Sequence, residues 1–342
     1  MKRYLKNLLR GCEKIEIRSA FVDLFRLFFF LPRKTKILEN LKRNRTDSNF
    51  FTASACAVFV SASSFLYGQS TSPFYQYALV RDLSDSFEDS LKLHLPTVPI
   101  DLHLAKKQHE NYIELLEKLV PNVIRLEADS SHPDCNFIED TAIIVDDIAV
   151  VSRMGAFERR GEEIAVAHAL RQLGIKNIIH LQSPGTMDGG DILYTGGHLF
   201  VGLSKRTNEY ALNQLKKIFQ GKIEVIGVPV IEGLHLKSVI SFFDSKTLIV
   251  ADNTAGREIQ SNIEQATNGD YTFVAVPEAV ASNVLRIGST LVMQEGFSAS
   301  EAILQDLSDQ KLVTLIKINM SELIKADGAL TCGSLLIKSV DE

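Results

Sequence analysis

The chain has 342 residues, of which 45% are apolar, so it can bury a sizeable core in one large domain or two. Its four cysteines, Cys12, Cys56, Cys135 and Cys332, show no CxxC spacing, which excludes a zinc knuckle. They are also too few for a disulfide scaffold. Reduced thiols in a cytoplasmic protein are the better interpretation.

The net charge of −5 is unevenly distributed. Residues 1–45 carry 13 Lys/Arg and 4 Asp/Glu, whereas the remainder carries 24 basic and 38 acidic residues. An acidic body argues against a nucleic-acid groove and suits a small cationic substrate.

Residues 1–75 differ in character from the rest and are predicted to form a separate basic and apolar extension. Within it, residues 50–68 carry no charge and follow the basic stretch LKRNR. Their length would suffice for a membrane anchor, whereas their serines equally indicate a disordered or weakly packed segment. A mitochondrial transit peptide fits less well, because Glu13, Glu16 and Asp23 interrupt the acid-poor pattern such peptides have.

Residues 76–342 are predicted to form the body of the protein, and the pattern there becomes regular. Residues 76–83 are expected to be a strand. Helical spacing of apolar residues predicts helices at 101–120, 162–174, 206–219 and 298–309. Apolar runs on either side of short polar turns predict hairpins at 142–153, 191–204, 238–252 and 283–294.

These elements form a hidden repeat. A polar or glycine position that opens each hairpin recurs at Asp140, Asp191, Lys237, Asn283 and Gly328, with separations of 51, 46, 46 and 45. Such a period, with a hairpin and a helix in each unit, predicts modules stacked around an axis or along a line. The last unit is cut short and an unpaired strand opens the body, so we expect the two ends to share one module and close a ring.

Three acidic residues, Asp134, Glu139 and Asp140, precede the hairpin at 142–153. They fit an ordinary solvated loop, but they also fit a carboxylate cluster that binds a metal ion or a guanidinium. Two further acids, Asp188 and Asp191, lie on either side of a Gly-Gly pair that permits a tight turn.

Arginines near two strand ends, Arg159 and Arg206, are either solvated or anchors for a substrate carboxylate. His235 lies in the strand-like run GLHLKSVIS, where a lone histidine is more often a core residue than a catalyst. In a closed ring, however, His235 and Cys332 would both face the axis. A Cys–His pair beside carboxylates provides an activated thiolate and a general acid.

Five stretches carry a family resemblance and occur in order between Ala78 and Val340: NFIEDTAIIV, RMGAFERRGEE, DGGDILYTGGHLFVGLSKRTNEYA, GLHLKSVISF and DGALTCGSLLI. Together they resemble the dimethylarginine dimethylaminohydrolase family of guanidino-group-modifying (pentein) enzymes. The resemblance implies an α/β fold, a five-fold ββαβ propeller, preceded here by a non-homologous N-terminal extension. The period near 46 residues agrees with that fold.

The resemblance also implies an activity, the hydrolysis of asymmetric dimethylarginine and monomethylarginine to citrulline, which would regulate nitric oxide synthesis. In this role Cys332 is the nucleophile, His235 the general acid and base, and Asp188 the residue that orients the histidine. Seven positions match substrate-binding positions of the family: Leu83, Asp134, Glu139, Asp140, Arg159, Arg206 and Ala326. No metal or other cofactor is implied, although zinc could inhibit such a Cys/His site. We expect a monomer or homodimer.

The sequence departs from the family pattern at several places. Gly333 replaces a second cysteine common in animal members, Met154 stands where proline is common, and RDLSDS lacks the usual proline after Leu83. Alternative interpretations are an arginine deiminase or amidinotransferase on the same scaffold, a catalytically silent arginine-binding relative, and a scaffold anchored to a membrane by residues 50–68.

Overall fold

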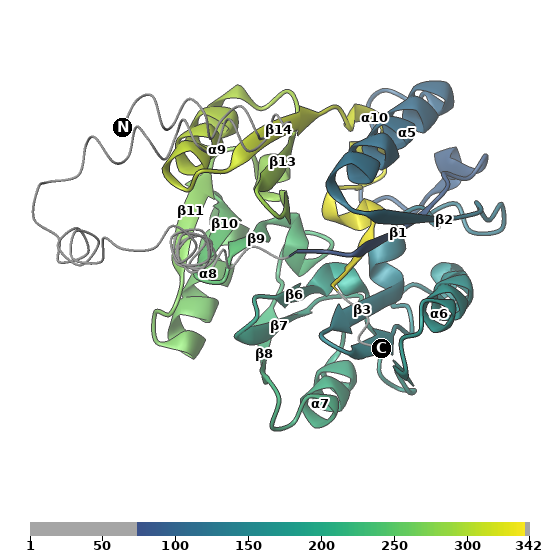
Figure 1. Ribbon diagram of the computed structural model, residues 1–342, viewed down its shortest axis with the longest axis horizontal. Coiled ribbons are helices and arrows are strands. Elements are labelled where there is room, and N and C mark those ends of the chain that lie inside the picture. The colour runs from purple at the N-terminus through teal and green to yellow at the C-terminus, as the bar shows by residue number, and fades with distance from the viewer. Residues whose placement is uncertain (1–73, 339–342) are drawn as a thin grey trace, which may run out of the picture. The chain divides into compact units, whose positions relative to one another are not determined.

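Five three-stranded sheets surround a common axis in the computed structural model, which describes residues 74–338 (Figure 1). In each sheet the middle strand pairs antiparallel with an inner strand, whose residues line the axis, and parallel with an outer strand. A helix on the outside of the ring connects the middle strand to the outer one. This arrangement confirms the α/β, five-fold ββαβ propeller.

Four modules are continuous in the chain. The first comprises β3 (Ala142–Val145), β4 (Ile148–Val151), α6 (Glu162–Gln172) and β5 (Asn177–His180). The second comprises β6 (Ile192–Tyr194), β7 (His198–Leu203), α7 (Glu209–Ile218) and β8 (Glu224–Pro229). The third comprises β9 (Ile240–Asp244), β10 (Thr247–Ala251), α8 (Thr254–Thr267) and β11 (Thr272–Val276). The fourth comprises β12 (Leu285–Ile287), β13 (Thr290–Gln294), α9 (Ser298–Gln310) and β14 (Thr314–Ile318).

The fifth module is built from both ends of the described chain. Its middle strand β1 (Tyr77–Arg81) is followed by α5 (Leu102–Leu119) and the outer strand β2 (Asn122–Leu126), whereas its inner strand β15 (Leu335–Ile337) comes last. Leu79 of β1 pairs with Leu335 of β15 in antiparallel register. The ring therefore closes as predicted.

A short 3-10 turn precedes every inner strand and brings its residues to the axis. These turns span Ile138–Thr141, Gly189–Asp191, Leu236–Ser238, Ala279–Ser282 and Thr331–Gly333. Equivalent positions, three residues before each inner strand, are Glu139, Gly189, Lys237, Ser282 and Cys332. Three of the five repeat positions read from the sequence, Asp140, Asp191 and Lys237, lie within these turns. Asn283 directly follows the fourth turn, and Gly328 lies three residues before the last one, whose equivalent position is Cys332.

Local capping explains the helix boundaries. Helix α6 ends at Gln172, and Gly174 just beyond it has a left-handed φ of 88°, a conformation that glycine adopts readily after a helix. Helix α7 begins at Glu209 rather than at 206, because the Asn208 side chain caps it by accepting a hydrogen bond from the backbone amide of Ala211.

The sequence analysis did not predict helix α8 or the outer strands of the sheets. The buried stripe of helix α8 holds only two large apolar residues, Ile259 and Ile263, and is otherwise made of small or polar residues. The outer strands are half exposed, as β5 illustrates, and lack the continuous apolar runs that mark the inner and middle strands.

The predicted extension, residues 1–75, lies almost entirely outside the described residues, and so does the uncharged stretch 50–68. Within residues 74–338 no helix is both long and apolar enough to cross a membrane.

Because the β1–β15 pair closes the ring, we expect that shortening a buried side chain in this pair lowers the stability of the protein substantially. Leu79 is fully buried at the β1–β15 pair, so Leu79→Ala should lower the free energy of unfolding by about 3 kcal/mol. Leu95→Ala, at a side chain that is 89% exposed, should change it by less than about 0.5 kcal/mol. Urea unfolding of both variants measures this difference, and equal midpoints would contradict it.

Candidate active site

A pocket of about 190 Å³ lies at the axis, where the 3-10 turns converge. Cys332, His235, Glu139 and Lys237 line it. Cys332 is a free, partly buried thiol whose backbone amide donates to the carbonyl of Ala329. We call this cavity the axial pocket.

His235 is oriented by a buried carboxylate. Its Nε2 donates to Oδ2 of Asp188 over 3.0 Å, and its backbone amide donates to Oγ of Ser238. Asp188 is fixed in turn, because Oδ1 accepts from the amide of Gly155 at 2.8 Å and Oδ2 also accepts from Nη1 of Arg206 at 3.1 Å. The imidazole therefore has one orientation and a defined proton on Nε2.

The surrounding carboxylates favour a charged histidine. Burial opposes the charge on His235, but the carboxylates of Asp140, Asp191 and Asp188 outweigh burial and raise its pKa to about 9. Burial likewise opposes the charge on Asp188, but the hydrogen bond and charge of His235 hold the pKa of this carboxyl well below its usual range. The pair is therefore an imidazolium–carboxylate pair at neutral pH.

The pKa of the Cys332 thiol is raised, whereas the pKa of an activated cysteine is lowered. Burial raises the pKa of Cys332, and the negative charges of Glu139 and Asp140 raise it further. Cys332 is therefore a neutral thiol at neutral pH in the ligand-free protein. A cation placed between it and the carboxylates would favour the thiolate.

Glu139 lies at the floor of the axial pocket and has two protein partners. Oε1 pairs with the ammonium of Lys237, and Oε2 accepts from the hydroxyl of Thr331 at 2.8 Å. Thr331 is held by Asn283, which accepts from its amide at 3.0 Å. These four residues near the nucleophile thus come from four different modules.

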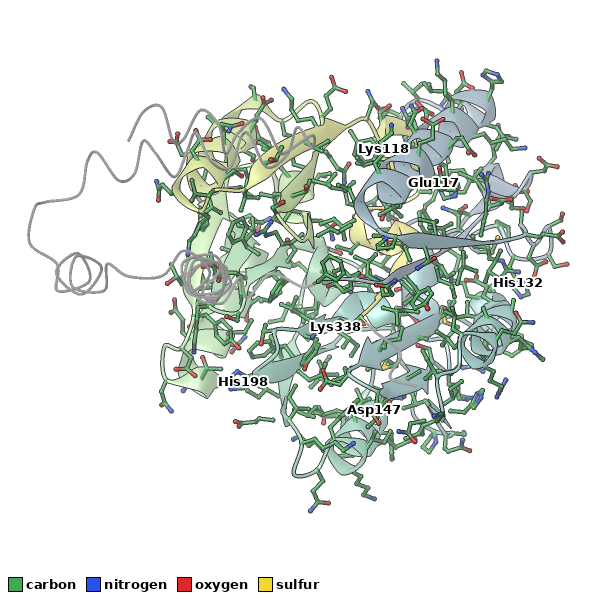
Figure 2. All side chains as sticks on the ribbon, in the orientation of Figure 1. Glu117, Lys118, His132, Asp147, His198 and Lys338 are labelled. Carbon is green, nitrogen blue, oxygen red and sulfur yellow. The ribbon has the colours of Figure 1, made fainter. Side chains whose placement is uncertain are left out.

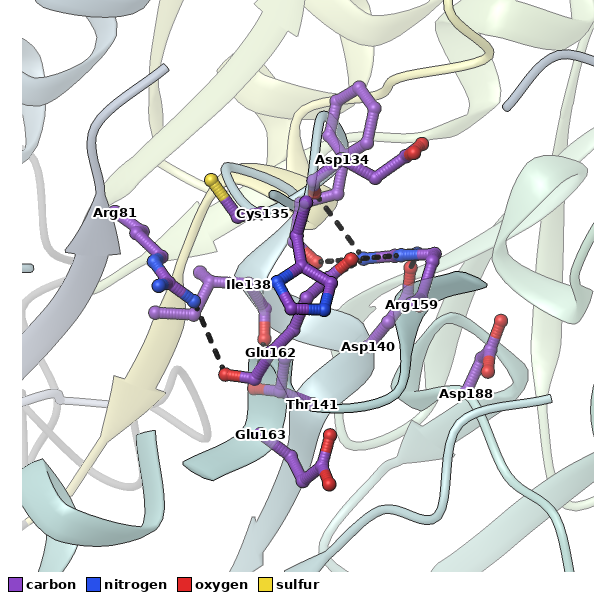
Figure 3. Close-up of polar contacts among 12 residues, drawn as sticks. Arg81, Asp134, Cys135, Ile138, Asp140, Thr141, Arg159, Glu162, Glu163 and Asp188 are labelled. Carbon is purple, nitrogen blue, oxygen red and sulfur yellow. Dashed lines mark hydrogen bonds and ion pairs between the residues drawn. The ribbon is translucent and has the colours of Figure 1, made fainter. Parts of the chain in front are cut away.

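Asp140 lies in the same 3-10 turn as Glu139 but has different partners. Its Oδ1 accepts from the amide of Gly190 at 2.8 Å and its Oδ2 from Nη1 of Arg159 at 2.6 Å. Arg159 also pairs with Glu162, as Figure 3 shows in the same cluster. A side chain at Gly190 would place its Cβ 2.5 Å from Nδ1 of His235, so only glycine fits there.

The structure brings together only some of the predicted site residues. Glu139, His235 and Cys332 line the axial pocket, with Asp140 and Asp188 directly behind it. The other predicted residues, all outside this lining, are Leu83, Asp134, Arg159, Arg206 and Ala326.

These outer residues have their own partners. Oδ2 of Asp134 accepts from the amide of Leu91, while Leu83 and Ala326 belong to one buried apolar cluster. Arg159 is 4% exposed and its guanidinium is fully engaged with Asp140, Glu162 and backbone carbonyls. Roles of these residues in substrate binding remain predictions.

Sequence reasoning did not assign Lys237, Thr331 or Asn283 to the site. Lys237 and Asn283 were nevertheless identified as repeat positions, and residues at or next to equivalent positions in a ring converge on the axis. That signal could have found both residues.

One cluster has the composition of a metal site. Asp140, Asp188 and His235 offer ligand atoms within 4.8 Å of one another. All four carboxylate oxygens, however, already accept hydrogen bonds from protein donors, which include Gly190, Arg159 and Gly155. The cluster therefore fits a hydrogen-bonded network that fixes His235.

Comparison with known proteins gives consistent matches. Residues 130–337 match the family model described as arginine deiminase. The chain is 29% identical over 265 residues to an N(G),N(G)-dimethylarginine dimethylaminohydrolase of Streptomyces coelicolor, covering 77% of this chain and 97% of that protein. It is 32% identical over 244 residues to an uncharacterized protein of Aeropyrum pernix, covering 69% and 85%.

Two solved structures share the fold. A mutant DDAH from Pseudomonas aeruginosa complexed with citrulline has a TM-score of 0.69 at 24% identity, covering 77% of this chain and all of that one. The N-terminal domain of ArgZ, a cyanobacterial arginine dihydrolase, has a TM-score of 0.65 at 18% identity, covering 77% and 98%.

The raised pKa of His235 predicts a pH-dependent stability. Unfolded histidine loses its proton near pH 6.5 whereas folded His235 keeps it to about 9, so its contribution is complete below 6.5 and is lost as pH rises through 9. Between these limits the wild type should lose up to about 3 kcal/mol more unfolding free energy than His235→Asn. Urea titrations at both limits, with exposed His103→Asn as the control, measure this. Parallel losses in wild type and His235→Asn would refute it.

Proposed function

Because this chain belongs to the arginine deiminase family, we propose that it hydrolyses Nω-methylated arginines to citrulline and dimethylamine or methylamine. The observation that carries the proposal is the axial pocket, in which Cys332 and His235 share a cavity with the Glu139 carboxylate. A nucleophile, a proton donor and an anion for a guanidinium are the three groups that this reaction requires.

Glu139 is the group we assign to the substrate guanidinium. In the ligand-free protein its Oε1 pairs with the ammonium of Lys237, so a cation already lies at this position. A guanidinium that displaces or joins this ammonium would bind with planar hydrogen bonds, which lysine cannot match. Asp140, behind the pocket, adds a second negative charge near Cys332.

Binding of a cationic substrate would activate the nucleophile. The charges of Glu139 and Asp140 help keep Cys332 protonated, and the guanidinium offsets them. The thiol then releases its proton to solvent, and Sγ attacks the central guanidinium carbon. The C–S bond forms as the carbon becomes tetrahedral.

His235 would supply the proton for the leaving group. With a pKa raised to about 9 it is protonated at neutral pH, and Asp188 holds its ring in place. Transfer of this proton to the departing nitrogen breaks the C–N bond and releases the methylated amine. An S-alkylthiouronium on Cys332 and a neutral His235 remain.

The second half-reaction would use the same histidine as a base. Neutral His235 takes a proton from water, whose oxygen attacks the thiouronium carbon. Collapse of this tetrahedral intermediate breaks the C–S bond and returns the thiolate of Cys332. The hydroxyl proton leaves to solvent, and citrulline remains.

The remaining predicted contacts concern the amino-acid end of the substrate. Of the two arginines, Arg206 is the better candidate for the α-carboxylate, because its side chain is 16% exposed and engages Asp188 through Nη1. Arg159 would act indirectly, by fixing Asp140. Asp134, Leu83 and Ala326 are proposed to shape the surrounding loops.

Two observations help to decide whether the substrate is a methylated or an unmodified arginine. Similarity to the Streptomyces coelicolor enzyme over nearly its full length supports methylated substrates, as do the apolar side chains in the pocket lining, Leu93, Leu234, Val280 and Ile324. The alternative is arginine itself, which is favoured by the name of the matching family model and by the fold shared with ArgZ. On the favoured assignment, the enzyme would remove inhibitors of nitric oxide synthesis.

Cys332→Ser tests the chemistry. It should lower kcat for citrulline formation by at least about 1,000-fold, because the hydroxyl is a far weaker nucleophile. Cys135→Ser, at the other cysteine within residues 74–338, should retain activity because Cys135 is buried outside the axial pocket. Citrulline release is measured with asymmetric dimethylarginine, monomethylarginine and arginine. Activity of Cys332→Ser, or a preference for arginine, would overturn the proposal.

Gly190→Ala tests the positioning of His235. The added Cβ would lie 2.5 Å from Nδ1 of His235 and 2.9 Å from Oδ1 of Asp140, so the imidazole must shift. We expect kcat to fall by about 100-fold with the fold retained. Gly197→Ala, whose Cβ meets nothing closer than 3.8 Å, should have wild-type kcat. Equal kcat values for the two variants would show that this contact does not set the position of His235.

A further inference from the structure

A second and larger cavity, of about 680 Å³, lies along the same axis. We call it the axial basin. It is lined by inner-strand residues and by hairpin turns that include Asp146 and Ser245, so it opens at the end of the ring opposite the 3-10 turns. Glu139 and Lys237 line both cavities, and their ion pair lies between the axial basin and the axial pocket.

The axial basin contains an excess of one positive charge. Its cationic residues are Lys237, Lys338 and Arg286, and its acidic residues are Glu139 and Asp146. Lys237 pairs with Glu139, and Nζ of Lys338 lies 3.9 Å from Asp146. Figure 2 labels Lys338 near the middle of the ring. The excess charge therefore belongs to Arg286.

Arg286 is buried and has no hydrogen-bonding partner among the residues that the structure describes. It is 8% exposed, and its Nε and Nη1 make no hydrogen bond within residues 74–338. Its Cζ lies 5.3 Å from the centroid of the Phe243 ring, whose π-electrons stabilise the cation. This contact does not replace the N–H···O hydrogen bonds that a guanidinium makes. The nearby carboxylate of Asp244 is already engaged by Lys311 at 3.3 Å and by the amide of Lys246.

A buried charge without a partner is costly, whereas an anion beside it recovers much of that cost. Burial lowers the pKa of Arg286, in keeping with this cost. A guanidinium is also the side chain best matched to a carboxylate, which it binds with two parallel hydrogen bonds.

The rest of the lining indicates what such an anion would carry. Most of its remaining side chains are aliphatic or aromatic, including Tyr75, Leu193, Phe242 and Leu335. Cavities of this volume are typical of small-molecule sites, in which a few polar groups orient an apolar body. We propose that the axial basin binds a small monocarboxylate with an alkyl or aryl body, its carboxylate on Arg286.

Calorimetric titration of the full chain tests the proposal, with 3-phenylpropionate as the probe and 3-phenylpropionamide as its neutral counterpart. The carboxylate should bind at least about tenfold more tightly than the amide. Arg286→Met should remove this preference. Lys338→Met, which affects a lysine near Asp146, should preserve most of it.

Three results would overturn the proposal: equal affinities for acid and amide, an unchanged preference in Arg286→Met, and no binding of the acid at millimolar concentration. The comparison of acid with amide uses the unmodified chain, so it decides the matter even if Arg286→Met does not fold. Because the readout is binding alone, the result is independent of the hydrolytic activity proposed above.

Discussion

The antiparallel pairing of β15 with β1 is the interaction on which the rest of the structure depends. It joins the last described strand to the first and converts four consecutive modules and two terminal pieces into a closed ring. Cys332 lies three residues before β15, so it reaches the axis only when this pair forms. His235 and Glu139 are carried by other modules, and the three groups share a cavity only in the closed ring.

Closure also concentrates negative charge in a region with little water. Glu139, Asp140, Asp188 and Asp191 are close to the axis and buried, so each must have donors nearby. Lys237, Arg159 and His235 supply them, along with backbone amides. The same field that keeps His235 protonated keeps Cys332 neutral, which leaves the ligand-free site with a proton donor in place and a nucleophile that requires a cationic ligand.

Parts of this arrangement were accessible from the sequence and parts were not. The hairpins and most helices follow from apolar runs and periodicity, and the spacing of about 46 residues predicted modules with converging turns. Helix α8 was not predicted, because its buried stripe holds only two large apolar residues. The outer strands were not predicted either, because they are half exposed, as β5 illustrates. The motif resemblance pointed to Cys332, His235 and Asp188. It could not show that the guanidinium of Arg159 is already paired with the carboxylates of Asp140 and Glu162.

The sequence by itself determined the fold class, the repeat and the residue types at the axis, because these depend on local periodicity and on motifs contiguous in the chain. Only the tertiary structure decided which charges meet. Lys237 reaches Glu139 across 98 residues and Thr331 reaches it across 192. It also decided that Nε and Nη1 of Arg286, in the axial basin, have no hydrogen-bonding partner within residues 74–338. Such pairings depend on distances of a few ångströms between modules, and Coulombic and hydrogen-bond energies vary steeply over that range.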